Sequence, residues 1–214
     1  MAKKNKKTKE YRKPAQFRTD PDPVVNPTAV RSEAKAQSNA MVLISAGLAT
    51  SVLLFFYYHF WTLGQLTESS GGLAMPDQRI FGFTVEQITE LRSVMSPEAI
   101  DQLAYVHRTV GMFFPLLFGF FSLLTLGQWI SDRVRRWVAW SAPLLFVIVD
   151  LWGNRVIDSL FRGELDAAAV TLASTLTIGR WVLLIATAII LLVLGLRRFN
   201  RTLKQKLHEA REGM

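Results

Sequence analysis

Long apolar runs alternate with charged segments along this chain. The runs at 40–63, 110–130 and 177–196 contain at most one charged residue each, which is Arg180 in the last of them. A helix needs roughly 20 predominantly apolar residues to cross the hydrocarbon core of a bilayer. We therefore predict a membrane-spanning helix at each of the three positions.

A fourth run, at 138–157, is apolar only as far as Val149 and then carries Asp150 and Asn154. We predict that it also spans the membrane, with these polar residues in one end of the helix. A re-entrant segment is the alternative. The predicted fold class is all-α, a polytopic membrane four-helix bundle with a small extracytoplasmic helical hairpin.

The basic residues of the connecting segments indicate an orientation. Lys and Arg number ten in residues 1–40, three in the 131–137 link and six in the 197–214 tail, against three in residues 64–109 and three in the stretch 150–180. Basic residues accumulate on the cytoplasmic side of membrane proteins. We predict that both termini and the link are cytoplasmic, and that the loops 64–109 and 158–176 are extracytoplasmic.

Composition narrows the function classes. The chain has 214 residues, half of them hydrophobic, a formal net charge of +8 and no cysteine, which excludes disulfides and thiol catalysis. The basic charge follows the topology and lacks interleaved aromatic residues, so we predict no nucleic-acid binding. Residues 1–39 combine lysines with repeated prolines and are predicted to be a disordered cytoplasmic tail.

The 64–109 loop carries two helix-start signals. Thr84, followed three residues later by Gln87, predicts a capping box. Ser96 before Pro97 predicts the start of a second short helix, since Ser favours the N-cap and Pro the first helical position. We expect the two helices to form a hairpin lying on the outer membrane surface.

A polar cluster is predicted where the third and fourth spans meet. Asp150, Asn154 and Asp158 are spaced by four and share one face of a helix. A rise of about 1.5 Å per residue puts Arg180 and Asn154 at equal depth, so Arg180 would neutralise charge that is costly in lipid. Gly153 and Gly179 favour a close approach of the two helices. The cluster is either an ion pair that fixes helix register or a functional polar site for a proton, an ion or a lipid headgroup; alternatively, Arg180 extends to the interface.

His59 and His107 are candidate metal or haem ligands, because axial ligation uses imidazoles that face one another. Aromatic residues flank both, however, and an aromatic belt with interfacial histidines is the favoured interpretation. We predict no metal and no cofactor. The sequence also has no HExxH, phosphate-loop or nucleophile-elbow motif.

Five short motifs lie between about residues 75 and 185: Pro76-Asp77-Gln78-Arg79, Gly82-Phe83-Thr84, Phe114-Pro115-Leu116-Leu117, Asp150-Leu151-Trp152-Gly153-Asn154 and Arg180-Trp181. In these motifs the chain resembles a family of small uncharacterised bacterial membrane proteins with four transmembrane helices. It departs from that pattern at Gly153, where an acid is usual, and at Gly111, where Asp is expected. The resemblance implies the four-span topology and a bacterial cytoplasmic (plasma) membrane, and it implies no reaction.

Two functions remain open. Few catalytic residue types and two exposed segments favour a non-enzymatic accessory subunit or scaffold, which implies a membrane-protein partner or a homo-oligomer within the bilayer. A small oligomeric carrier or lipid-handling protein that uses the polar junction of the third and fourth spans is the alternative.

Overall fold

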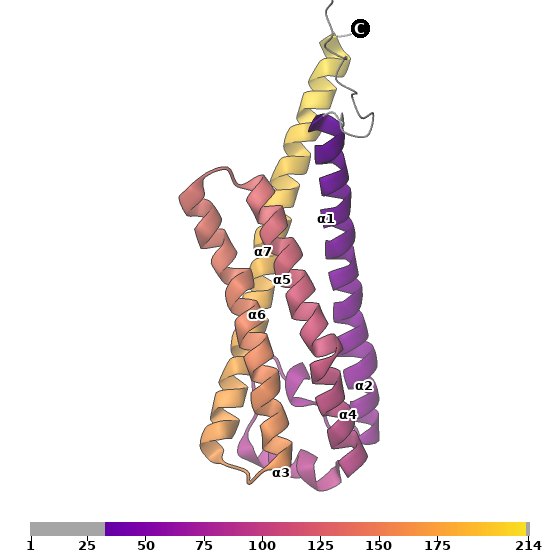
Figure 1. Cartoon of the computed structure of the whole chain (residues 1–214), viewed down its shortest axis with the longest axis vertical. Helices are drawn as coiled ribbons and strands as arrows, with labels where there is room; N and C mark the ends of the chain where they lie inside the picture. The colour runs from indigo at the N-terminus through magenta and orange to yellow at the C-terminus, as the bar shows by residue number, and fades with distance from the viewer. Residues whose placement is uncertain (1–32, 213–214) are drawn as a thin grey trace, which may run out of the picture. The chain divides into compact units, whose positions relative to one another are not determined.

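The computed structural model describes residues 33–212, and this part of the chain is helical with short connections and no β-strand. The prediction of an all-α helical bundle is confirmed. Figure 1 shows the helices in chain order. Their bounds are α1 Glu33–Phe56, the π-helical turn η1 Tyr57–Thr62, α2 Leu63–Ser69, the 3₁₀ turn η2 Pro76–Gln78, α3 Val85–Val94, α4 Pro97–Arg108, α5 Val110–Trp129, α6 Arg133–Arg162 and α7 Ala167–Glu212.

Three helical stretches are long and apolar enough to cross a membrane: Asn39–Ser69, Pro97–Trp129 and Ala167–Glu212. In the first and last of them only 17% and 11% of the most apolar stretch is buried within the protein. Apolar side chains that face outward to this extent need a lipid environment. The chain is therefore a membrane protein.

The helix α6 is the most polar of the long helices and is unbroken over 30 residues. At about 1.5 Å per residue it is roughly 45 Å long, which exceeds the thickness of a hydrocarbon core. The contacts of α6 with α7 and with α5 are the two most extensive between elements of the described chain. The predicted 138–157 segment thus lies within one continuous helix.

The connections are shorter than predicted. The expected 131–137 link reduces to residues 130–132, because Asp132 caps α6 by accepting the backbone N–H of Arg135 at 2.8 Å. The expected 158–176 loop reduces to residues 163–166. Its second half is helical because the carboxylate of Asp166 accepts the N–H groups of Ala168 and Ala169, and so satisfies donors at the start of α7.

Both ends of the bundle also differ from the prediction. The first long helix begins at Glu33 rather than at residue 40, and α7 continues without a break through the expected 197–214 tail as far as Glu212. The disordered tail predicted for residues 1–39 otherwise lies outside the described residues.

The two helices of the 64–109 loop form where their caps predict. Thr84 and Gln87 exchange side-chain and backbone hydrogen bonds, and the Ser96 hydroxyl accepts the N–H of Ala99. The helix α4 does not lie flat, however. It continues along the direction of α5 beyond a break at Thr109, as Figure 1 shows.

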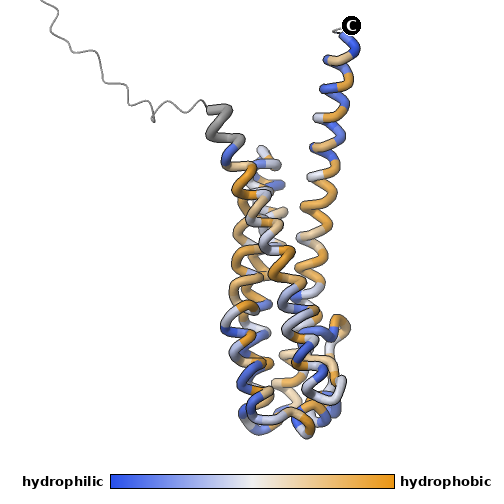
Figure 2. Tube along the Cα trace, turned by 90° about the vertical axis from the view of Figure 1, so that its right-hand side faces the viewer, coloured by the Kyte–Doolittle hydropathy of each residue, from blue (hydrophilic) through white to orange (hydrophobic). Residues whose placement is uncertain are grey.

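The hydrophobic core lies at one end of the bundle. We call this end, where residues 64–109 pack, the loop end, and the opposite end, toward Glu212, the tail end. The largest cluster of buried apolar side chains includes Tyr58, Leu103 and Ile157, all at the loop end. Toward the tail end α7 extends beyond the turn between α5 and α6 (Figure 1), and its residues change from apolar to polar along its length (Figure 2).

Candidate functional site

Arg180 of α7 is buried at the loop end, with 3% of its surface exposed. One guanidinium nitrogen, Nη1, donates to Asn154 Oδ1 at 3.0 Å and lies 2.8 Å from Asp77 Oδ1 and 3.6 Å from Asp150 Oδ1. The guanidinium therefore connects α7, α6 and the loop through a single nitrogen. We refer to Tyr58, Asp77, His107, Asp150, Asn154, Asp158 and Arg180 as the Arg180 network.

Asp77 is the centre of this network and is fully buried. Its Oδ1 accepts the Tyr58 hydroxyl at 3.1 Å as well as Arg180, and its Oδ2 lies 3.3 Å from His107 Nε2. The backbone carbonyl of Asp77 accepts the indole N–H of Trp181. Burial acts to raise the pKa of this carboxyl, but Arg180 and His107 outweigh it and hold the pKa well below its usual range.

Local backbone structure holds Asp77 in place. Pro76 opens the 3₁₀ turn, where its fixed φ suits the first helical position. The side chain of Gln78 then accepts the backbone N–H of Met75 and the hydroxyl of Thr67, and donates to the carbonyl of His59. The turn is thereby attached to α2 and to η1, and Asp77 projects into the bundle.

His107 of α4 connects Asp77 to Asp158. Its Nδ1 lies 2.5 Å from Asp158 Oδ1, while its Nε2 is directed at Asp77. His107 is 4% exposed. Both ring nitrogens thus face a carboxylate oxygen, and neither is available to a metal ion.

Asn154 joins the network to α5. Its Nδ2 donates to the carbonyl of Gly111 at 3.1 Å and lies 3.5 Å from Asp150 Oδ2. A Cβ added at Gly111 would lie 3.3 Å from that Nδ2 and 3.4 Å from the Tyr58 hydroxyl. A side chain at position 111 would therefore crowd Asn154 and Tyr58, which would have to shift by a few tenths of an ångström.

The structure brings together three of the four predicted cluster residues, Asp150, Asn154 and Arg180. Asp158 shares the helix face of Asp150 and Asn154 but contacts His107 instead of Arg180. The close approach attributed to Gly153 and Gly179 does not depend on glycine, since a Cβ added at either would meet its neighbour at 3.6 Å, an ordinary van der Waals distance.

Sequence reasoning missed Tyr58 and Asp77 as members of the network, and it did not predict that His107 is buried between two carboxylates. Tyr58 looked like part of an aromatic belt, and Asp77 lies in a segment without periodicity. The only signal for Asp77 was its place in the first of the five motifs.

His59 packs among aromatic rings. It stacks on Phe55 with ring centroids 4.5 Å apart and meets Trp181 edge-on at 5.1 Å. Its Nδ1 lies 3.3 Å from the backbone carbonyl of Phe55. Within residues 33–212 no group of three or more His, Asp or Glu side chains is placed to hold a metal ion.

Most side chains of the network are buried, but some of the polar atoms in and beside it lack a hydrogen-bond partner. Within the described part of the chain, Arg180 Nε and Nη2 and the Thr177 hydroxyl are buried without a hydrogen-bond partner. A cavity of about 140 Å³ reaches His107, Asn154 and Asp158 from outside. Buried donors of this kind are usually satisfied by ordered water or a small ligand. The site can therefore hold water, an anionic oxygen or a proton.

Comparison with protein-family models, with curated proteins and with solved structures finds no match to this chain.

Proposed function

We propose that this chain is a four-span protein of the cytoplasmic membrane, with both termini in the cytoplasm, that serves as a non-enzymatic accessory subunit or scaffold. In this proposal α6 is the remaining span and the loop end lies outside the cytoplasm. The observation that carries it is the insertion of Asp77 into the bundle, which attaches this part of the 64–109 loop to α7.

The topology is supported by packing and by charge. The length of α6 and its packing against α5 and α7 suit a crossing segment. The excess of Lys and Arg in the first 40 residues, around Arg133 and after Leu196 favours a cytoplasmic tail end.

The contact surface is supported by two exposed apolar side chains on the fixed loop. Phe81 is 95% exposed and its neighbour Ile80 is 43% exposed. The next residues are held firmly, because the N–H of Phe83 donates to the Ser174 hydroxyl of α7 at 2.9 Å and Gly82 turns the chain with φ +84°. A preordered apolar surface loses little conformational entropy on binding a partner.

Purification of the full chain in a mild detergent tests this function. We expect a stoichiometric partner protein, identified by mass spectrometry, and we expect its recovery to fall at least about tenfold in Phe81→Ser, since anchor side chains carry most of the binding energy. Phe199→Ser, an equally apolar change at an exposed residue of α7, is the matched control. A chain that purifies without a partner, or an equal loss in the control, contradicts the proposal.

The second candidate is a small oligomeric carrier or lipid-handling protein. The unpaired donors of Arg180 and the cavity beside His107 favour it. Four spans are few for a monomeric carrier, so this function requires several copies. A homo-oligomer that retains lipid or a small anion through purification, and loses it in Arg180→Leu, would favour the carrier over the scaffold.

A further inference from the structure

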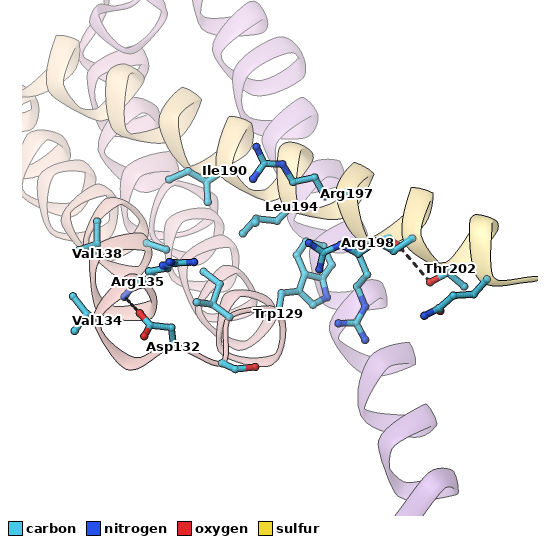
Figure 3. Close-up of a pocket in the computed structure, with 15 residues that line it drawn as sticks. Trp129, Asp132, Val134, Arg135, Val138, Ile190, Leu194, Arg197, Arg198 and Thr202 are labelled. Atoms are coloured by element: carbon cyan, nitrogen blue, oxygen red, sulfur yellow. Dashed lines mark hydrogen bonds between the residues drawn. The ribbon is translucent and has the colours of Figure 1, made fainter.

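A large groove lies far from the Arg180 network, at the tail end. It has a volume of about 1010 Å³ and lies between the α5–α6 turn and the part of α7 around Leu194 and Arg198. Figure 3 shows its lining, with Trp129 between the two sides. The groove takes no part in the function proposed above.

The polar side of this groove is strongly basic. Four arginines line it, and all four are exposed: Arg135, Arg197, Arg198 and Arg201. The only carboxylate in the lining is Asp132, and that side chain is engaged in capping α6 through the N–H of Arg135. The groove thus presents several guanidinium groups with little opposing charge, which favours phosphate.

The other side of the groove is apolar. It is formed by Trp129, Val138, Ile190 and Leu194. Ile190 and Leu194 belong to the apolar run of α7, and Arg197 is the first charged residue after it. In a helix that crosses a membrane, this change marks the boundary between hydrocarbon and headgroups.

We propose that this groove binds one anionic phospholipid. The arginines hold the phosphate at the level of the headgroups, and an acyl chain lies along Trp129, Ile190 and Leu194. A soluble phosphate compound would use the arginines but leave the apolar wall uncovered. A zwitterionic lipid would bring a cation of its own toward the four guanidinium groups. The juxtaposition of arginines and apolar wall at the membrane boundary therefore fits an anionic lipid.

The test uses the full-length chain in neutral detergent, with bound lipid counted by native mass spectrometry. The probes are dioleoyl phosphatidylglycerol, phosphatidylcholine with the same acyl chains, and glycerol phosphate. We expect phosphatidylglycerol to bind at least tenfold more tightly than either other probe. An arginine near an anionic lipid contributes about a fivefold preference, so R197Q/R198Q should weaken phosphatidylglycerol binding by at least tenfold.

The matched control is R133Q/R211Q, which removes the same charge from exposed positions outside the groove and keeps the basic N-terminal residues. We expect it to bind as the unaltered chain does, and we expect all variants to keep their helical circular dichroism. Equal affinity for both lipids, equal loss in the control, or glycerol phosphate binding as tightly as the whole lipid would each overturn the proposal.

Discussion

The two ends of the bundle are held together to different degrees. At the loop end, side chains from η1, α2, α4, α6 and α7 are buried against one another around Asp77 and Arg180. Toward the tail end α7 buries only Thr187 after Arg180. The first helix shows the same change, since between residues 39 and 56 it buries only Ile44, Gly47 and Ser51.

The difference between the two ends shows that buried charge pairs and apolar contacts contribute unequally to holding helices together in a membrane. Lipid tails are as apolar as leucine, so apolar side chains alone give helices little reason to associate within a bilayer. Buried charges that satisfy one another do bind helices, because a separated partner would be left unpaired in a medium of low polarity. The loop end uses such pairs, whereas among the described residues the tail end has no buried ion pair, and many apolar side chains of α1 and α7 face outward there.

Replacing Arg180 with leucine should have the largest effect on this difference. It leaves Asp77 and Asp150 without their cation, and we expect a loss of about 3–5 kcal/mol in the free energy of unfolding, measured in mixed micelles. Arg155→Leu, at an exposed position of α6, is the control and should cost less than about 1 kcal/mol. A double replacement with Asp77→Leu that is more stable than Arg180→Leu alone would show that the unpaired carboxylate causes the loss. Equal stability of Arg180→Leu and the control would contradict the role of the pair.

The same substitution at two positions of α7 tests whether the loop end is more firmly packed than the tail end. Leu176→Ala at the loop end opens a cavity in the core and should cost at least about 2 kcal/mol in the same measurement. Leu194→Ala removes a partly buried side chain at the tail end, where lipid can refill the space, and should cost less than about 1 kcal/mol. Equal costs would mean that the tail end is as firmly packed as the loop end.

The dependence of folding stability on pH should reveal the low pKa of Asp77. The pKa of Asp77 is lower in the folded chain than the value of about 3.9 in an unfolded one. Its stabilising contribution is therefore present above that value and is lost as the pH falls through the folded pKa. We expect Asp77→Asn to cost about 1.5–3 kcal/mol near neutral pH, as for a hydrogen bond to a charged group.

The matching measurement is the melting temperature of both chains from pH 7 to pH 3. The difference between them should narrow below about pH 4. A difference that widens with acid would contradict a depressed pKa for Asp77.

Three long apolar helices and part of the network could be predicted because the rise and turn per residue of a helix are fixed. Periodicity placed Asp150 and Asn154 on one face, and the rise per residue placed Arg180 at their depth. The lengths of the connections could not be predicted in the same way. A polar residue such as Asp158 suggests a loop in the sequence, but in the structure it lies in α6 and pairs with His107 inside the bundle.

The position of Asp77 inside the bundle could not be predicted from a sequence pattern. It lies 103 positions before Arg180, in a short 3₁₀ turn between irregular segments, where a residue count gives no depth. Its position depends on the side chain of Gln78 and on the indole of Trp181, and these contacts form only when the bundle assembles.

The unbroken course of α7 has a consequence for how this chain can vary in length. Arg180 and Leu194 belong to one helix of 46 residues, and each residue turns a helix by about 100°. A single residue inserted between them would leave Arg180 in its place and rotate Leu194 and the arginines beyond it away from α6. Seven inserted residues, close to two full turns, would nearly restore the phase. The angular register of α7, and not only its composition, therefore determines which side chains face the groove.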